Sequence, residues 1–368
     1  MKKIKILFAI PELNAGGAER VILNIINSID REAFEIHLAL FNSSGVLVKE
    51  LRDDVVLHDL HLSSVTKGIF SFIKKIYEIR PDVLFSGIGH LNIALAPFIP
   101  ILRYLLPSTY WVARQSSIIS INNLLEKRPS VHEWLYHHVY KNYDKIICQS
   151  VYMQNDLIDN YQFPIEQTEV INNPVDIKRI NRLSSKASVN LLDKDSINLL
   201  SVGQLRPEKQ QEFMIRALAM LDQRYRLILI GDGVKRSSLE DLAEELEIQD
   251  RVRFLGYQSN PYIYMREADL LILSSKYEGF PNVVLEANVC GLPVVSLCSP
   301  GGVIEIIEEG VNGFLVSTKN IEDLVKGVER AVKYKFDTKV IETMMTERYS
   351  LDLIIKKYQK ILKIRNKL

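Results

Sequence analysis

Two glutamates separated by seven residues are the groups best placed to bind a polyhydroxylated ligand. Glu278 and Glu286 enclose the sequence Gly-Phe-Pro-Asn-Val-Val-Leu. An ionised carboxylate only accepts hydrogen bonds, so it suits sugar hydroxyls. Pro281 predicts a helix start, and the N–H groups of a helix N-terminus attract phosphate. A nucleotide sugar combines both features. Taken alone, however, Glu278 could be a helix-start carboxylate and Glu286 an ordinary solvated residue.

The predicted elements place both glutamates at one edge of a sheet. Residues 270–273 are an apolar run typical of a strand buried on both faces, and 275–279 form the loop that follows it. A helix over 282–289 then ends at Gly291 and Pro293. Ligands of open α/β sheets bind outside the carboxyl ends of the strands.

A glycine pair and two further side chains follow predicted strands in the first half of the chain. Asn14-Ala-Gly16-Gly17 lets backbone N–H groups approach a ligand closely, although it could equally be a turn that only starts a helix. It lacks the third glycine of the dinucleotide fingerprint. His90 titrates near neutrality and Arg114 binds oxyanions, so either could serve an acceptor or a departing phosphate. A loop histidine with no catalytic role is the simpler alternative for His90.

A basic loop follows a strand in the second half. The sequence Gln204-Leu-Arg206-Pro-Glu-Lys209 can place two cations where a leaving nucleoside diphosphate gains negative charge. Such cations would stabilise the transition state without a metal, although a basic loop can also simply be solvated.

Composition indicates a two-domain globular protein. The chain has 368 residues, 47% hydrophobic and 25% charged, and a net charge of +1. This balance does not suggest a nucleic-acid partner. Three cysteines without metal-ligand spacing, Cys148, Cys290 and Cys298, favour a reducing cytosol. The short apolar start over 4–10 is better interpreted as a buried strand than as a signal peptide.

Several other patterns indicate neither a metal site nor a membrane span. Asp193-Lys-Asp195 lies in a polar stretch, and neither His137-His138 nor His58 with His61 has the three or four converging ligands that a metal needs. We therefore expect no metal. Residues 93–106 are too interrupted by proline and Arg103 to span a bilayer. Residues 67–75 and 99–103 could either touch a bilayer or pack inside the protein.

Strand-like and helix-like segments alternate twice along the chain, which predicts two doubly wound parallel sheets. The polar stretch 178–196 is interpreted as part of the boundary between them. We expect strands at 4–10, 34–40, 82–85, 110–113, 145–148, 197–202, 225–230, 252–255, 270–273 and 294–297. We expect helices at 18–29, 67–79, 132–143, 151–160, 210–221, 234–247, 261–267 and 282–289.

The motif from Glu278 to Glu286 resembles the E-x7-E signature of retaining family 4 glycosyltransferases. The resemblance covers nearly the whole chain, through the motifs Gly16-Gly-Ala-Glu-Arg20, Asn173-Pro-Val-Asp176, Val202-Gly-Gln-Leu-Arg-Pro-Glu-Lys209, Gly231-Asp-Gly233 and Gly310-Val-Asn-Gly-Phe-Leu315. It implies the GT-B fold, two Rossmann-like domains facing a cleft. An acceptor domain would span 1–172 and a nucleotide-sugar domain 173–348. The amphipathic helix at 349–368 would pack back onto the first domain, whereas its basic face also allows a membrane-surface helix.

The resemblance also implies roles for individual residues. Catalytic groups would be Glu278, Lys209, Arg206 and His90. The donor would contact Gly16, Gly17, Gln204, Gly231, Gly233, Tyr257, Gly279, Phe280, Pro281, Asn282, Val283 and Glu286, and the acceptor would contact His90, Arg114 and Asn14. The family usually has arginine where this chain has Gln204, so we expect Arg206 to swing in as its replacement.

The activity implied is transfer of a hexose or N-acetylhexosamine, with retention, from a nucleotide diphosphate sugar. A UDP-sugar is favoured, and the acceptor would be a hydroxyl of a glycan or lipid-linked glycan in surface polysaccharide synthesis. No cofactor is implied, and the protein would be cytoplasmic, in contact with the inner face of the membrane. Two alternatives stay open: a nucleotide-sugar epimerase of the same shape, and a non-catalytic scaffold that binds sugar nucleotides.

Overall fold

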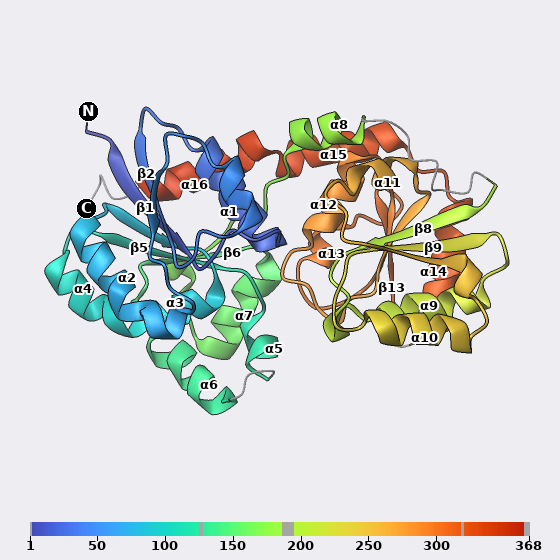
Figure 1. Cartoon of the computed structure of the whole chain (residues 1–368), viewed down its shortest axis with the longest axis horizontal. Helices are drawn as coiled ribbons and strands as arrows, with labels where there is room; N and C mark the ends of the chain where they lie inside the picture. The colour runs from blue at the N-terminus through green and yellow to red at the C-terminus, as the bar shows by residue number, and fades with distance from the viewer. Residues whose placement is uncertain (1, 125–127, 186–194, 318–319, 364–368) are drawn as a thin grey trace. The chain divides into compact units, whose positions relative to one another are not determined.

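The computed structural model describes residues 2–124, 128–185, 195–317 and 320–363. The chain divides into two compact units, each with its own sheet (Figure 1). Unit 1 runs to Pro174 and includes the last helix, which begins at Leu351; unit 2 runs from Val175 to Ser350. Both units are parallel α/β structures, so the predicted fold class is confirmed for each unit.

Unit 1 is built on a seven-stranded parallel sheet of order β3-β2-β1-β4-β5-β6-β7. Its strands are β1 (Ile4–Ile10), β2 (Phe34–Leu40), β3 (Val56–Asp59), β4 (Val83–Ser86), β5 (Tyr110–Gln115), β6 (Lys145–Cys148) and β7 (Thr168–Val170). Its α-helices are α1 (Gly17–Ser28), α2 (Val65–Ile79), α3 (Gly89–Leu95), α4 (Ile99–Leu105), α5 (Ile119–Asn123), α6 (Pro129–His138), α7 (Val151–Tyr161) and α16 (Leu351–Lys363).

Unit 2 is built on a six-stranded parallel sheet of order β10-β9-β8-β11-β12-β13. Its strands are β8 (Ile197–Val202), β9 (Tyr225–Ile230), β10 (Val252–Gly256), β11 (Leu270–Leu273), β12 (Val294–Leu297) and β13 (Gly313–Val316). Its α-helices are α8 (Ile177–Ser184), α9 (Gln211–Met220), α10 (Arg236–Glu245), α11 (Tyr262–Glu267), α12 (Asn282–Val289), α13 (Val303–Ile306), α14 (Ile321–Lys333) and α15 (Thr338–Tyr349).

The structure corrects several sequence predictions. The stretch 178–196 is not simply a polar boundary, because α8 occupies Ile177–Ser184. The helix predicted over 132–143 ends at His138, and a short 3₁₀ turn, η3 (Tyr140–Asn142), follows. Strands β3, β7 and β13 were not predicted, because they have only three or four residues and lack a long apolar run.

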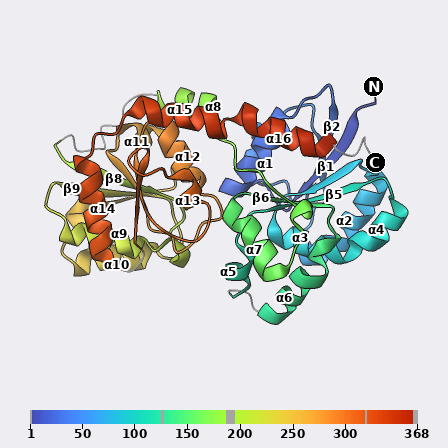
Figure 2. The same ribbon diagram turned by 180° about the vertical axis from the view of Figure 1, so that it is seen from behind.

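The terminal helix α16 contributes to the core of unit 1. Ile354, Ile355, Tyr358, Ile361 and Leu362 are buried in the same cluster as β1, β2 and α1. Figure 2 shows α16 next to α1, and the two helices are in contact. These five residues are the apolar face that the sequence places on one side of this helix.

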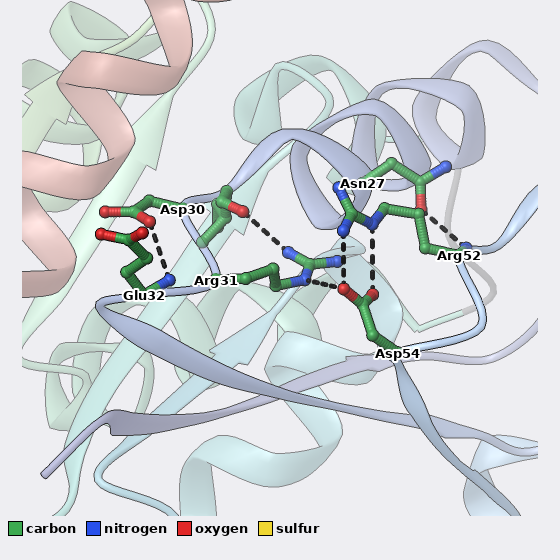
Figure 3. A network of polar contacts seen from close by, with 7 residues as sticks. Asn27, Asp30, Arg31, Glu32, Arg52 and Asp54 are labelled. Atoms are coloured by element: carbon green, nitrogen blue, oxygen red, sulfur yellow. Dashed lines mark hydrogen bonds and ion pairs between the residues drawn. The ribbon is translucent and has the colours of Figure 1, made fainter.

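An ion-paired network stabilises the amino-terminal edge of the unit 1 sheet (Figure 3). Asp54 pairs with Arg31 (Nε–Oδ2 3.2 Å) and with Arg52 (Nη2–Oδ2 2.7 Å), and Asn27 Oδ1 accepts from the backbone N–H of Arg52. The network joins the turn after α1 to the segment before β3. It lies where β2 begins, opposite the edge where ligands of such sheets bind, and we interpret it as structural.

None of the described helices is long and apolar enough to cross a membrane. The segment 93–106 is instead divided among α3, the 3₁₀ turn η2 (Ala96–Phe98) and α4.

Candidate active site

The strand order reverses between β8 and β11, and this switch point positions the main candidate site. From β8 the chain continues to β9 and β10 on one side, whereas β11, β12 and β13 lie on the other side. Loops that leave neighbouring strands in opposite directions open a crevice at their carboxyl ends. Lys209 follows β8 and Glu278 follows β11, so two residues that are 69 positions apart become neighbours.

Lys209 and Glu278 form a close ion pair. Lys209 Nζ lies 2.5 Å from Glu278 Oε1, and the Ser275 hydroxyl donates to the same oxygen at 2.6 Å. The two charged side chains are 29% and 12% exposed, so both are partly withdrawn from water while still reachable. A charge-assisted hydrogen bond in such a setting is stronger and more directional than a fully solvated one.

The backbones of the two loops are also bonded to each other. The buried Ser274 hydroxyl oxygen lies 2.8 Å from the carbonyl oxygens of both Lys209 and Gln210, and its single proton is donated to one of them or shared between them. The N–H of Lys276 donates to the carbonyl of Glu208 at 2.8 Å. The loop positions are therefore fixed by bonds that do not depend on the ion pair.

A segment that the sequence analysis missed supports the Glu278 loop from the other side. The N–H of Glu278 donates to the carbonyl of Pro300 at 3.0 Å, and the N–H of Gly302 donates back to the Glu278 carbonyl at 3.2 Å. A Cβ on Gly302 would lie 2.5 Å from a ring carbon of Phe280 and 2.8 Å from the Gly279 carbonyl oxygen. Only glycine permits this approach. The available signal was a pair of glycines just after a predicted strand.

Helix α12 begins at Asn282 and ends at Val289, as predicted. Its N-cap residue, Pro281, makes no side-chain capping bond. The other end is held by a buried amide pair: Asn312 Nδ2 donates to Asn288 Oδ1 (2.8 Å) and to the Ile306 carbonyl (2.9 Å), and Asn312 Oδ1 accepts from the Glu308 N–H (2.7 Å). This network fixes α12 and hence the direction in which its N-terminus points.

Glu286 lies in a different environment from Glu278. Its Oε1 accepts a long hydrogen bond from the Tyr262 hydroxyl (3.4 Å), which in turn accepts from Arg179 Nη1 (3.0 Å). Sequence reasoning missed both partners, because Arg179 lay in the stretch interpreted as a polar boundary and nothing in the sequence pointed Tyr262 towards Glu286. The chain from Arg179 to Glu286 orients a carboxylate on α12.

Gln204 and Arg206 remain on the surface of the β8 loop. Arg206 is about half exposed and faces Glu208, with Nη1 and Oε1 4.0 Å apart. Within the described residues no ion pair joins Arg206 to Glu278. The expected swing of Arg206 towards the site is therefore absent from this conformation and stays a prediction.

The predicted base-binding residues lie at the ends of β9 and β10. The N–H of Gly231 donates to the Gly256 carbonyl (2.8 Å), and the Leu205 N–H donates to the Asp232 carbonyl (3.0 Å), so the turns after β8, β9 and β10 are linked. Gly231 has φ +133°, and a Cβ there would lie 1.9 Å from the Gly203 carbonyl oxygen. Gly233 lies in the same turn as Gly231. Tyr257 directly follows β10 and is 65% exposed.

Unit 1 contains the predicted acceptor residues and two of the predicted donor residues, Gly16 and Gly17. All lie on or just after β1, β4 and β5, and the unit's own switch point is between β1 and β4. Asn14 is exposed and donates to the Glu12 carboxylate. Gly16 is the N-cap of α1, and Gly17 is its first residue. His90 is exposed on the first turn of α3.

Arg114 differs from these residues because its side chain is completely buried. Its Nη2 donates to Asn173 Oδ1 at 2.6 Å, whereas Nε and Nη1 have no hydrogen-bond partner within the described residues. Burial raises the pKa of the Glu19 carboxyl, and the nearby Arg114 charge partly offsets that rise. Glu19 was not singled out from the sequence. Its signal was the spacing of three residues after the helix-capping Gly16.

Metal-binding and nucleophilic groups are not gathered in the described part of the chain. No group of three or more His, Cys, Asp or Glu residues there could hold a metal. His37 and His58 stack and share a 2.9 Å contact without a third ligand. Burial raises the pKa of Cys290 to about 12, so this thiol stays protonated at neutral pH. Asp193 and Lys194 lie outside the described residues.

Comparison with known proteins gives two family matches that follow one another along the chain. Residues 15–179 match the model for Glycosyltransferase Family 4, and residues 185–344 match the model for Glycosyl transferases group 1. Together they span both units.

Of two curated relatives, one matches almost the full length of the chain and the other about half of it. The chain is 28% identical, over 89% of its length and 90% of the relative's, to a Campylobacter jejuni enzyme named N-acetylgalactosamine-N,N'-diacetylbacillosaminyl-diphospho-undecaprenol 4-alpha-N-acetylgalactosaminyltransferase. It is 35% identical to a Thermobispora bispora D-inositol 3-phosphate glycosyltransferase, over 47% of this chain and 44% of that protein.

A solved structure shows the same architecture. The Anabaena protein HepE, crystallised with UDP and glucose, superposes with a TM-score of 0.80 at 23% identity, covering 98% of this chain and 99% of HepE. The likeness shows the fold. From the two family matches and the shared architecture, the chain belongs to the family 4 glycosyltransferases of GT-B fold.

Proposed function

We propose that this glycosyltransferase moves a hexose or N-acetylhexosamine from a UDP-sugar to a hydroxyl of a lipid-linked glycan. The observation that carries the proposal is the Lys209–Glu278 pair beside the N-terminus of α12, at the β8/β11 switch point. This set offers a cation and helix N–H groups to a diphosphate and a carboxylate to sugar hydroxyls.

The two charged groups would have different tasks. Lys209 binds the β-phosphate of the donor and stabilises the negative charge that develops there. Glu278 accepts hydrogen bonds from the transferred sugar, with Gly279, Phe280, Asn282 and Val283 around it. When a donor binds, its phosphate replaces Glu278 as the main partner of Lys209.

The nucleoside would extend over the neighbouring strand ends. Glu286, oriented by Tyr262, holds the ribose hydroxyls. Gly231, Gly233 and Tyr257 border the base, and the exposed Tyr257 ring is available to stack on it. Arg206 and Gln204 supply the outer wall of the phosphate site.

We assign a retaining mechanism. The bond between the sugar C1 and the leaving phosphate oxygen breaks, and the acceptor oxygen bonds to C1 on the same face. The acceptor proton passes to the departing phosphate. No carboxylate is a nucleophile, and the fixed cation Lys209 takes the charge-neutralising role without a metal. The alpha linkage in the name of the Campylobacter relative supports this stereochemistry, because the common UDP-hexoses are themselves alpha-linked.

The names of two relatives support the proposed acceptor. The name of the C. jejuni relative describes an undecaprenyl-diphosphate-linked acceptor, and a Rhizobium meliloti relative is named for lipopolysaccharide core biosynthesis. We infer a cytoplasmic enzyme that meets its acceptor at the inner face of the membrane. His90 and Asn14, both exposed in unit 1, are the residues assigned to contact the acceptor. Arg114 is completely buried and would act on the acceptor through its charge rather than by contact.

A transfer assay tests the proposal. Purified protein is incubated with UDP-glucose, UDP-galactose, UDP-N-acetylglucosamine, UDP-N-acetylgalactosamine or GDP-mannose, with and without a lipid-linked oligosaccharide. We expect an acceptor product, with retained configuration, from a UDP-sugar. An epimerised donor in the absence of acceptor would indicate an epimerase instead. Sugar-nucleotide binding without turnover under any condition would indicate a scaffold.

A further inference from the structure

One surface of unit 1 combines exposed aromatic, aliphatic and basic side chains that the proposed chemistry does not use. We call it the outer face. It consists of two adjoining helical stripes, both exposed: Lys67, Phe70, Lys74 and Tyr77 on α2, and Pro97, Pro100, Ile101, Tyr104 and Leu105 along η2 and α4.

Helix α4 is apolar on both sides. Its inner side, with Ile99 and Leu102, is buried in unit 1. On its outer side Ile101 is 64% exposed and Tyr104 is 87% exposed. The outer residues recur at intervals of three and four, so they form one continuous stripe. Apart from Arg103, which pairs with Asp144, α4 is apolar on its inner and outer sides. An apolar side of a helix is normally covered, so this outer stripe lacks its cover.

The exposed stripe of α2 alternates basic and aromatic residues. Lys67, Phe70, Lys74 and Tyr77 follow one another at intervals of three or four residues along one side. The Arg80 guanidinium lies 5.2 Å from the centre of the Tyr77 ring. Aromatic rings beside long basic side chains are characteristic of a membrane–water interface, where the rings enter the headgroup layer and the charged ends stay in water.

The two stripes form a continuous surface. The Phe70 ring on α2 contacts the Phe98 ring, directly before α4, with centroids 5.6 Å apart in an edge-to-face arrangement. Figures 1 and 2 both show α2 and α4 next to each other at the end of unit 1.

The positive charge of the outer face favours an anionic partner. Neither 65–77 nor 97–108 contains an acidic residue. Glu78, near the C-terminal end of α2, pairs with Lys75 (Nζ–Oε2 2.6 Å), and its Oε1 lies 4.0 Å from Lys74 Nζ. Lys67 and Arg80 add further positive charge. Flexible lysines between aromatic rings suit mobile lipid headgroups, because they do not require one fixed set of carboxylates.

We propose that the outer face docks on an anionic phospholipid bilayer. Phe70, Ile101 and Tyr104 enter the headgroup layer, while Lys67 and Lys74 contact lipid phosphates. The inference rests on the proposed function only for the reason to dock, because a lipid-linked acceptor would lie in the same bilayer. The docking itself depends on these side chains and not on catalysis.

Vesicle cosedimentation tests the proposal. The full-length protein is mixed with vesicles of phosphatidylglycerol and phosphatidylethanolamine, or of phosphatidylcholine alone. We expect salt-sensitive binding to the anionic vesicles and little binding to phosphatidylcholine. I101S/Y104S should lower the partition coefficient by more than about tenfold, from lost apolar burial. K67E/K74E should lower it by more than about tenfold as well, because each lysine near such a surface is worth about fivefold.

Matched variants on unit 2 provide the controls. Met220 and Val340 are 53% and 49% exposed there, so M220S/V340S removes exposed apolar surface outside the outer face, although less than I101S/Y104S does. K326E/K335E makes the same charge change as K67E/K74E at exposed lysines. Both should bind vesicles like the wild type. A UDP thermal shift checks that each variant is folded.

Three results would overturn the proposal: no binding of the wild type to anionic vesicles, unchanged binding of I101S/Y104S, or equal losses in the unit 2 variants. Light scattering adds a fourth, since loss of self-association in I101S/Y104S without loss of vesicle binding would make the outer face a contact between two copies of the chain. Vesicle binding without any glycosyl transfer would contradict the proposed function and leave the docking inference standing.

Discussion

The two units share one plan, but one buried polar side chain in each, Asn312 and Arg114, differs in how fully it is hydrogen-bonded. In unit 2 the buried amide of Asn312 has a partner for its oxygen and for both N–H groups. In unit 1 the buried guanidinium of Arg114 has one strong partner, Asn173, while Nε and Nη1 have none within the described residues. One network is complete, whereas the Arg114 guanidinium, which has the Glu19 carboxyl and the Tyr358 hydroxyl near it, is only partly hydrogen-bonded.

The difference separates groups that stabilise the fold from groups retained for another purpose. A fully bonded buried amide helps to hold its surroundings in place, whereas a buried charge with unmet hydrogen bonds costs stability. Natural proteins tolerate such a cost chiefly at functional positions. We therefore interpret Asn312 as structural support for α12, and Arg114 as a residue whose charge serves the reaction.

The largest expected effect is on turnover at the unit 2 site. E278Q and K209M should each lower kcat/KM by about 10²- to 10³-fold, because each removes a fixed charge aimed at the donor. Their melting temperatures should stay close to that of the wild type, since the loops are held by backbone bonds as well as by the ion pair. Steady-state kinetics and calorimetry check both statements.

Exposed residues of the same unit give matched controls for these variants. K326M and E322Q change the same residue types on α14, outside the candidate site. They should retain wild-type kcat/KM. Wild-type turnover in E278Q or K209M would remove the assignment of the site.

Breaking the hydrogen-bond network of Asn312 should cause the largest loss of stability. N312A removes three hydrogen bonds and leaves Asn288 Oδ1, the Ile306 carbonyl and the Glu308 N–H without their side-chain partners. We expect a loss of about 2–4 kcal/mol in the free energy of unfolding of unit 2. Urea denaturation followed by circular dichroism measures it. A loss below 0.5 kcal/mol, far under the usual cost of unmet buried groups, would show that the network does not hold α12.

Substitution of Arg114 should lower transfer activity more than it lowers stability. R114M removes a buried charge that is incompletely bonded, but it also takes away the donor of the buried Asn173 Oδ1, so the free energy of unfolding should fall by about 1–2 kcal/mol, less than in N312A, where three groups lose their partners. Transfer activity should fall while UDP affinity is unchanged, because the side chains assigned to UDP, Lys209, Glu286 and Tyr257, lie in unit 2. The same denaturation experiment, with kinetics and UDP titration, tests this. Destabilisation as large as that of N312A would erase the contrast between the units.

The smallest expected effect is on how the free energy of unfolding depends on pH, and it comes from Glu19. Burial raises the pKa of this carboxyl in the folded state, so the native protein binds more protons than the unfolded chain between the two pKa values. Stability from this group therefore falls as pH rises through that interval. E19Q should match the wild type below the interval and be slightly more stable above it, by less than about 1 kcal/mol because the carboxyl is partly solvated. Unfolding curves at pH 4 and pH 8 compare them, and a stability loss at pH 8 would show that Glu19 instead supports Arg114.

Much of the framework around the donor site could be predicted from local sequence. Strands β8, β9, β11 and β12 and helix α12 have the predicted bounds, because apolar runs, proline and glycine act over short distances. The contact between Lys209 and Glu278 required the family resemblance, since no local pattern reports which strands are neighbours. The sequence analysis missed Gly302, Tyr262 and Glu19 because their importance lies in what they touch.

Arg114 and the outer face show a second limit of prediction from sequence. A strand-end arginine suggests a solvent-facing ligand, but its actual depth depends on how Asn173 and α16 pack around β5. Residues 99–105 are apolar at nearly every position, so sequence alone did not distinguish a core helix from a membrane-contacting one. In the structure Ile101 and Tyr104 are 64% and 87% exposed, so this helix is not enclosed in the core.

The most direct measurement is calorimetric titration of UDP into the wild type, K209M and E278Q. If Lys209 binds the diphosphate and Glu278 the sugar, K209M should weaken UDP binding by more than about tenfold. E278Q should bind UDP at least as tightly as the wild type, because Lys209 loses the carboxylate that competes with phosphate. Equal UDP affinity in all three proteins would contradict the account.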